Sequence, residues 1–291
     1  MEQEREFDIL LSEVKRICPF IPEGYKRSYI SRRIRARMRI LGIRSYGDYI
    51  AYIRKDPGEA PLLFDRLTIN VTGFFRDMDV FRIIEEKVLP VIMELQEGPV
   101  RIWSAGSSDG REAYSLLLMI QNGYPGFLDS VRFIATDIDV SKLEEGKKGI
   151  YRYGQGRNIS EEVPPKLLRS LSIDGNMVRI PDRLRRKVRF FKHDLLRDDP
   201  IPSQDLILCR NLLIYLPSRS QERVLKVLAG SLKKGGFLVL GKSEHLADSL
   251  MEEMELFDLQ GRIFRKRLET GNFPQRSTLS REETKTDFVE G

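Results

Sequence analysis

Residues 101–112 read RIWSAGSSDGRE, and residues 133–139 read FIATDID. Each stretch starts as a short apolar run of the kind that forms a buried strand. The first run enters a loop rich in glycine and serine and then a helix start, whereas the second run ends in Asp137. A strand, a tight loop, a helix and a second strand that ends in an acid are typical of one βαβ unit that binds a nucleoside.

The same alternation continues along the chain. We predict strands at 100–104, 131–136, 205–209 and 236–241, helices at 111–121, 140–147 and 219–233, and a final pair of strands near 255–258 and 262–266. This alternation predicts an α/β fold with a mainly parallel sheet and helices on both faces. Residues 150–193 break the rhythm with prolines and short β-prone runs at 177–180 and 187–191, so we predict a small inserted β-subdomain there.

The first 75 residues predict an all-α domain with an unusual charge. We expect helices at 7–20, 26–41 and 46–55, followed within the linker 76–98 by a long helix from about residue 79 to residue 95. Between Tyr25 and Gly47 the chain has eight basic residues and no acidic one. A solvated face is one explanation, but arginines without acidic partners favour docking of an acidic macromolecule. The outward surface of the second helix carries Arg32, Arg33, Arg35, Arg37 and Arg39.

Composition excludes several classes of protein. The chain has 291 residues, of which 41% are hydrophobic, yet no apolar run approaches the roughly 20 residues of a membrane span. The N-terminus is acidic where a secretory signal would be basic, so we expect a soluble, cytoplasmic protein. Two cysteines without ligand or CxxC spacing, and two histidines without partners, predict neither a disulfide nor a metal site. The polar tail 269–291 is expected to be disordered.

The loop between the first strand and its helix predicts a ligand site. Gly106 and Gly110 would let the backbone pass close to a ligand, and the helix start near Arg111 would direct free N–H groups at it. A plain strand-to-helix turn would look the same. The loop is not GxGxxG, which disfavours a nicotinamide or flavin. Asp137 could accept hydrogen bonds from both ribose hydroxyls, or, as Asp139 could, cap the next helix.

Further segments narrow the ligand. The strand at 205–209 runs into Arg210 and Asn211 at the carboxyl edge of the sheet and delivers Tyr215, which by itself could equally be a core residue. Residues 70–77 mix polar groups with two phenylalanines, an unusual composition for a plain linker. Residues 232–241 are similar to the turn and strand of S-adenosylmethionine-dependent methyltransferases.

Together these motifs closely resemble the chemotaxis receptor methyltransferases of the CheR type. The matching segments run in family order from the basic helices to about residue 267. They are Asn70-x-Thr72-x-Phe74-Phe75-Arg76, residues 101–105, Gly110-x-Glu112, residues 135–139, Gly149-Ile150-Tyr151, residues 209–215 and Gly241-Lys242-Ser243-Glu244.

The resemblance implies a Rossmann-like methyltransferase domain over 99–268, with S-adenosylmethionine as cofactor and S-adenosylhomocysteine as product. Arg76 and Tyr215 would meet the reacting carboxylate. This chain has His193-Asp194-Leu195 where the family has Asn-Leu near the adenine, and Asp109 and Arg111 also depart from the family loop, yet we expect binding to survive. The implied cofactor contacts are Asn70, Thr72, Arg76, Ala105, Gly106, Glu112, Asp137, Asp194, Leu195, Arg210 and Asn211.

The implied reaction is methylation of glutamate carboxylates on methyl-accepting chemotaxis receptors during sensory adaptation. A glutamate is already ionised at neutral pH, so no catalytic base is needed. We expect a monomer that docks its arginine-covered helix on the receptor's cytoplasmic helices and does not insert into the membrane. A weakly active S-adenosylmethionine-binding signalling or scaffold protein is the alternative. A nucleic-acid partner is disfavoured because the arginines lack interleaved aromatics. Whether residues 150–193 bind a receptor tail peptide is open.

Overall fold

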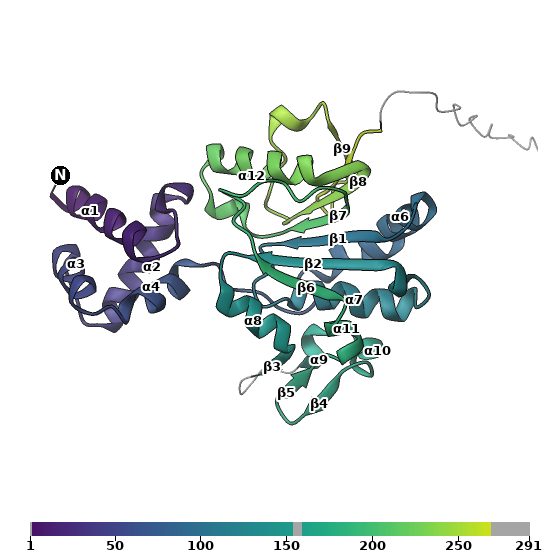
Figure 1. Cartoon of the computed structure of the whole chain (residues 1–291), viewed down its shortest axis with the longest axis horizontal. Coiled ribbons are helices and arrows are strands. Elements are labelled where there is room, and N and C mark those ends of the chain that lie inside the picture. Colours follow the sequence, from purple (N-terminus) through teal and green to yellow (C-terminus); the bar gives the residue numbers. More distant parts are fainter. Residues whose placement is uncertain (1, 154–158, 269–291) are drawn as a thin grey trace, which may run out of the picture.

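The computed structural model describes residues 2–153 and 159–268. Its centre is a seven-stranded sheet in the order β6-β2-β1-β7-β8-β10-β9 (Figure 1). The parallel part consists of β6 (Val188–Lys192), β2 (Val131–Asp137), β1 (Val100–Ala105), β7 (Gln204–Cys209) and β8 (Leu232–Leu240). The antiparallel strands β10 (Ile263–Lys266) and β9 (Met254–Asp258) complete one edge. The predicted mainly parallel α/β sheet is confirmed.

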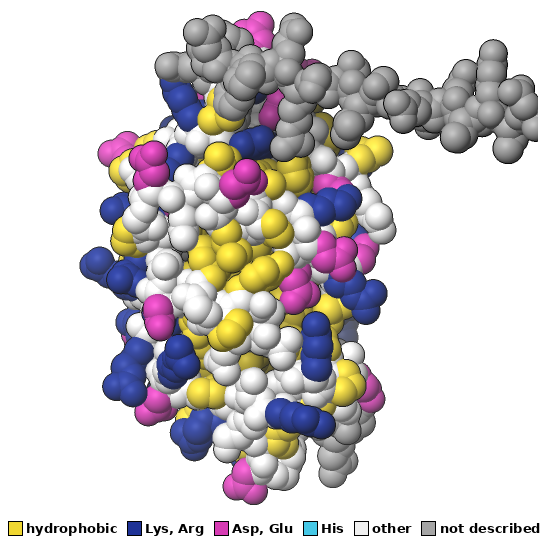
Figure 2. All heavy atoms as spheres, turned by 90° about the vertical axis from the view of Figure 1, so that its right-hand side faces the viewer, with side chains coloured by type: hydrophobic (Ala, Val, Ile, Leu, Met, Phe, Trp, Pro, Cys, Tyr) yellow, Lys and Arg dark blue, Asp and Glu magenta, His cyan; other side chains and the backbone are white. Residues whose placement is uncertain are grey.

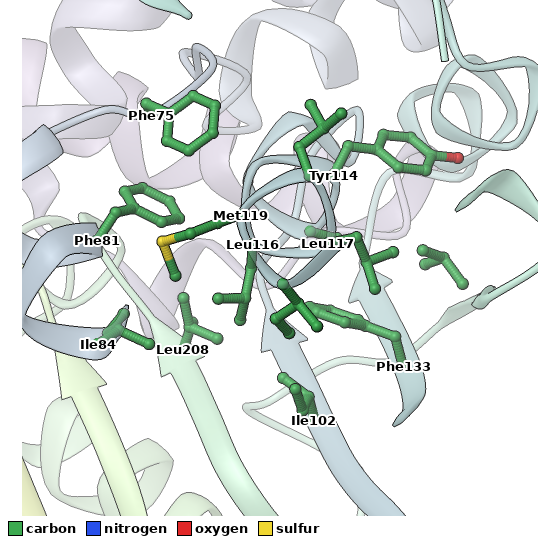
Figure 3. Packing of buried hydrophobic residues seen from close by; sticks show 14 of the residues in the cluster. Phe75, Phe81, Ile84, Ile102, Tyr114, Leu116, Leu117, Met119, Phe133 and Leu208 are labelled. Atoms are coloured by element: carbon green, nitrogen blue, oxygen red, sulfur yellow. The ribbon is translucent and has the colours of Figure 1, made fainter. Parts of the chain in front are cut away.

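Helices cover both faces of this sheet, which explains why its strands read as continuous apolar runs. On one face, α7 (Arg111–Gly123) packs Leu116, Leu117 and Met119 over side chains of β1, β2 and β7 (Figure 3). On the other face, α12 (Ser218–Ser231) contributes Val224, Leu225 and Leu228 to a second core that includes Trp103. Helix α8 (Val140–Lys148) follows β2. The packed helices therefore fix the positions of the strand ends, where a site can form.

The linker is helical without a break from residue 78 to residue 95, which confirms the predicted long helix. It consists of α5 (Met78–Ile83), a π-helical turn η2 (Ile84–Val88) and α6 (Leu89–Leu95). Pro90 has no N–H and its ring collides with the carbonyl four residues earlier, so the widened turn accommodates it. Phe75 and Phe81 pack beside α7 and fix the linker to the sheet (Figure 3).

The N-terminal domain contains one more helix than the sequence analysis predicted. Its helices are α1 (Glu2–Ile17), α2 (Arg27–Ile40), α3 (Tyr46–Lys55) and α4 (Glu59–Leu67). Pro61 obscured α4 in the sequence, but it lies in the first helical turn, where a missing N–H costs nothing. Ile30, Ile34 and Met38 form the apolar face of α2 and are buried in a core separate from the sheet. These helices lie to the left of the sheet in Figure 1.

The inserted subdomain has fewer residues than predicted and is partly helical. Its three-stranded antiparallel sheet has the order β3 (Ile150–Arg152), β5 (Met177–Arg179) and β4 (Ser172–Asp174), with short helices α9 (Ile159–Glu162), α10 (Pro165–Leu168) and α11 (Asp182–Arg185). The run at 187–191 was predicted to belong to it. That prediction is wrong, because β6 pairs in parallel with β2 and buries Val188 and Phe190 in the main core.

The surface differs between the two ends of the molecule. The end shown in Figure 2, opposite the N-terminal helices, presents hydrophobic side chains surrounded by charges of both signs. Basic side chains are concentrated instead on α2. In the described ranges, no helix has the length and apolar character that crossing a bilayer requires. The predicted tail 269–291 lies outside the described residues.

Candidate active site

A pocket lies where the carboxyl ends of β1, β2, β6 and β7 meet the linker. The residues that form it come from six separate stretches of the chain and from both domains. They are Tyr25; Ile69, Val71, Thr72, Gly73, Arg76 and Phe81; Gly106, Ser107, Ser108 and Glu112; Asp137 and Ile138; His193, Asp194, Leu195 and Leu196; and Arg210, Asn211, Leu212, Leu216 and Val224. Nine of the eleven cofactor contacts predicted from the sequence line this pocket; Asn70 and Ala105 do not.

Asp137 lies at the end of β2 with its carboxylate held by the backbone. One oxygen accepts from the Ser108 N–H at 2.8 Å and the other from the Asp139 N–H at 3.0 Å. Burial raises the pKa of Asp137 to about 6, although both hydrogen bonds oppose the shift. Each oxygen keeps a further lone pair, so the side chain can accept hydrogen bonds from a diol. The alternative cap role belongs to Asp139, which accepts from the N–H groups of Ser141 and Lys142.

Arg210 ties the edge of β7 to the linker. Its guanidinium donates to the Asp77 carboxylate at 2.6 Å, to the Arg76 carbonyl at 2.8 Å and to Glu112 at 3.3 Å. Only 2% of this side chain is exposed. Glu112 also accepts from the Ser104 hydroxyl at 2.8 Å. Arg210 therefore compensates the negative charge of two carboxylates and holds the start of the linker against the edge of the sheet.

The segment 70–77, named the lid from here on, covers one side of the pocket. Thr72 and Arg76 line the pocket, and Arg76 is exposed with its Nη1 donating to the Val71 carbonyl at 3.1 Å. Asn70 instead donates to the Thr68 hydroxyl at 2.8 Å and to Asp139 at 3.2 Å. It anchors the beginning of the lid to the end of β2.

The glycine loop serves two purposes. Gly106 lines the pocket with φ +73°, as the predicted close approach of a ligand requires. Gly110 does not line it. A Cβ there would lie 2.7 Å from the Phe190 ring, so this glycine permits packing of β6 against the start of α7. The proposed ligand contact of Gly110 is replaced by this packing role. Ala105 is buried in the sheet core behind the pocket.

The remaining wall combines apolar, aromatic and polar side chains. Asp194 and Leu195 line it together with His193, whose ring packs edge-on against Trp103 at 5.4 Å. The Asp194 carboxylate accepts from the Leu196 N–H at 2.9 Å, which shapes the loop after β6. Tyr25 enters this wall from the N-terminal domain, and burial raises its pKa. A flat heterocycle would fit between such side chains.

Tyr215 lies outside the pocket lining, between the two domains. Its ring packs against Tyr29 with the ring centroids 4.8 Å apart. Lys26, immediately before α2, donates its backbone N–H to the Tyr215 carbonyl at 2.8 Å and its ammonium to the Ile214 carbonyl at 2.7 Å. The start of the basic helix therefore holds the loop that carries this tyrosine.

The arginines of α2 divide into two groups. Arg32, Arg35 and Arg39 are exposed, as predicted. Arg33 is half-buried with its guanidinium 5.4 Å from the centre of the Tyr29 ring. Arg37 is not free for docking, which corrects its assignment: it donates to Glu59 at 2.8 and 2.6 Å, and the Glu59 side chain has no exposed surface. Glu59 lies on α4, the helix that the sequence analysis missed.

The pocket fits S-adenosylmethionine. The hydroxyls of Ser107 and Ser108 and Nδ1 of His193 are buried polar atoms that have no hydrogen-bond partner among the residues that the structure describes. All three belong to pocket-lining residues, and buried polar atoms of this kind are normally paired. A nucleoside with hydroxyl and ring-nitrogen groups would supply hydrogen-bond partners for these atoms, while Asp137 would accept hydrogen bonds from the ribose hydroxyls. For the described part of the chain, no cluster of metal-binding side chains is found.

Comparison with known proteins agrees with this geometry. Residues 70–261 match the model "CheR methyltransferase, SAM binding domain", and residues 5–68 match "CheR methyltransferase, all-alpha domain". The chain belongs to the CheR methyltransferase family. Its cofactor is therefore S-adenosylmethionine, and the boundary between the two matches falls at the beginning of the lid.

Relatives of this CheR protein include named enzymes. A "Chemotaxis protein methyltransferase" of Listeria innocua is 31% identical and covers 84% of this chain and 91% of its own length. "Chemotaxis protein methyltransferase 1" of Vibrio cholerae is 38% identical over 66% of this chain and 70% of its own length. An uncharacterized 104.1 kDa protein of Rhodobacter capsulatus is 31% identical over 82% of this chain, which spans only 25% of that protein.

Sequence reasoning missed several contributors to this CheR site, among them Tyr25 and Glu244. Tyr25 gave no signal, because its role depends on how the N-terminal domain packs against the sheet. Glu244 was noted only as part of a motif. It is 2% exposed and accepts from the N–H groups of Gly241, Asn211, Leu213 and Ile214 at 2.6–3.3 Å. It thereby shapes the loop from Arg210 to Tyr215.

Proposed function

We propose that this chain is a protein-glutamate O-methyltransferase. Its substrates would be glutamate side chains on the cytoplasmic helices of methyl-accepting chemotaxis receptors, and its products methyl esters. The names of the Listeria and Vibrio relatives support a role in chemotaxis. The observation that carries the acceptor class is Arg76, a solvent-exposed guanidinium on the rim of the cofactor pocket. We further propose that the enzyme acts as a monomer in the cytoplasm.

The proposed chemistry needs orientation rather than deprotonation. S-adenosylmethionine, when bound, supplies a methyl group activated by its sulfonium. The acceptor carboxylate is already ionised at neutral pH. Arg76 donates one hydrogen bond to the Val71 carbonyl, and its other guanidinium N–H groups can bind a carboxylate. Tyr215 would approach from the side of α2 and limit the directions open to that carboxylate.

Docking is assigned to the exposed row on α2. Arg32, Arg35 and Arg39 follow at spacings of three and four, so they form one positive stripe. A receptor helix that presents glutamates is complementary to such a stripe. Within the stripe, the Arg32 guanidinium lies 6.0 Å from the centre of the Tyr29 ring, and Tyr29 packs against Tyr215, so Tyr29 connects the docking stripe with the proposed reacting centre.

A labelled-methyl assay tests the proposal. The purified protein is incubated with S-[methyl-³H]adenosylmethionine and membranes containing a chemoreceptor, and the membranes are then treated with base. We expect volatile labelled methanol, with Arg76→Ala reducing its rate and Arg82→Ala, a control on α5, leaving it unchanged. Cofactor binding without ester on any receptor tested would favour the alternative signalling or scaffold role. Base-stable label on nucleic acid would overturn the acceptor class.

A further inference from the structure

The lid rests on a carboxylate of the inserted subdomain. The Phe74 N–H donates to Oε2 of Glu162, on α9, at 3.0 Å. The Tyr153 hydroxyl donates to the same oxygen at 3.2 Å. A Cβ placed on Gly73, a residue that lines the pocket, would lie 3.2 Å from that oxygen. Glu162 therefore lies directly behind the part of the lid that faces the cofactor.

A second layer joins the subdomain to the glycine loop. The Phe74 ring meets Tyr151 edge-on at 5.2 Å, and the Tyr151 hydroxyl donates to the Asp109 carbonyl at 2.7 Å. The Arg111 guanidinium lies 5.4 Å from the centre of the Tyr151 ring and pairs with the Asp109 carboxylate at 2.7 Å. Neither Asp109 nor Arg111 lines the pocket. These departures from the family loop thus face the subdomain.

The lid needs this external support because its backbone is strained. Phe75 and Asp77 adopt φ values of +47° and +58°, in the left-handed region that side chains disfavour. Side chains from other elements hold both positions: the Ser115 hydroxyl accepts from the Phe75 N–H at 2.9 Å, and Arg210 binds the Asp77 carboxylate. Glu162 supplies the corresponding contact at Phe74, on the subdomain side.

We propose that Glu162 is a positioning residue for cofactor binding. By holding the Phe74 N–H, the subdomain keeps Thr72 and Gly73 against the pocket, so that changes in the subdomain alter affinity for S-adenosylmethionine. The inference rests on the proposed role of the lid as a cofactor cover. It makes the subdomain part of the cofactor site without a direct contact to the cofactor.

Calorimetric titration with S-adenosylhomocysteine tests this inference on the full chain. We expect Glu162→Ala to weaken binding about tenfold, which corresponds to about 1.4 kcal/mol. Glu162→Gln should restore most of the affinity, because an amide oxygen also accepts the Phe74 N–H. Glu161→Ala is the matched control, an exposed glutamate on the same helix, and should bind like the wild type. In assays of methyl transfer, Glu162→Ala should raise KM for S-adenosylmethionine and leave kcat nearly unchanged.

The outcomes are separable. A merely structural role would lower the melting temperature and the active fraction of Glu162→Ala without changing the dissociation constant of the active fraction. If Glu162→Ala does not fold, Glu162→Asp withdraws the carboxylate by one methylene and should give an intermediate loss. Equal affinity of the wild type and every Glu162 variant overturns the proposal. Failure of the wild type itself to bind S-adenosylhomocysteine would instead contradict the function proposed above.

Discussion

Asp137 predicts that cofactor affinity depends on pH. Its carboxyl group, with a pKa of about 6, is neutral below that pH and ionised above it. Only the ionised form offers both oxygens to ribose hydroxyls while it keeps the bonds from the Ser108 and Asp139 N–H groups. At pH 5 about one tenth of the free protein carries the ionised form, so the apparent Kd for S-adenosylhomocysteine should be about tenfold higher than at pH 7.

The assay is calorimetric titration from pH 5 to pH 8 on the wild type and on Asp137→Asn. The amide variant should bind more weakly at pH 7 and lose the pH dependence. His193 also lines the pocket, so His193→Gln is the control variant. An affinity that is constant from pH 5 to pH 7, or a dependence that disappears only in His193→Gln, would refute the reasoning.

Two further predictions concern residues whose roles the structure changed. Gly110→Ala should destabilise the protein by about 2 kcal/mol or more, because φ of Gly110 is +80° and the new Cβ would overlap the Phe190 ring. The measurement is the melting temperature, which should fall; a melting temperature equal to that of the wild type would contradict this prediction. Arg37→Ala should lower the free energy of unfolding in urea by about 3–5 kcal/mol, because it leaves Glu59 buried without its cation. Arg39→Ala should unfold like the wild type and slow only receptor methylation. Equal stability losses in the two variants would contradict the division of the α2 arginines into two groups.

The sheet and much of the pocket could be predicted because their signals are local. Apolar runs give the strands, and the rule that ligands bind at strand carboxyl ends places Asp137 and Arg210 together. The predicted helix at 111–121 agrees with α7, although all residues from Ala113 to Ile120 are buried.

The misses depend on contacts between distant residues. Pro61 concealed α4, and without α4 the acidic partner of Arg37 was not visible. The run at 187–191 has the composition of any short strand, and only pairing with β2 determines its sheet. Tyr25 joins the pocket across a domain boundary. No periodicity in one segment encodes such neighbours.

The hydrogen bonds from Lys26 to the loop that carries Tyr215 have a consequence for substrate choice. Lys26 is the N-cap residue of α2, and its two hydrogen bonds join the start of this helix to the proposed reacting centre, so the arginine stripe and the pocket keep a fixed separation. Under the proposed function, this fixed separation would set the distance along the receptor helix between the docked surface and the methylated residue. Which glutamate is methylated would then be decided by its distance, in helical turns, from the acidic patch that docks on α2, and not by the amino acids on either side of it.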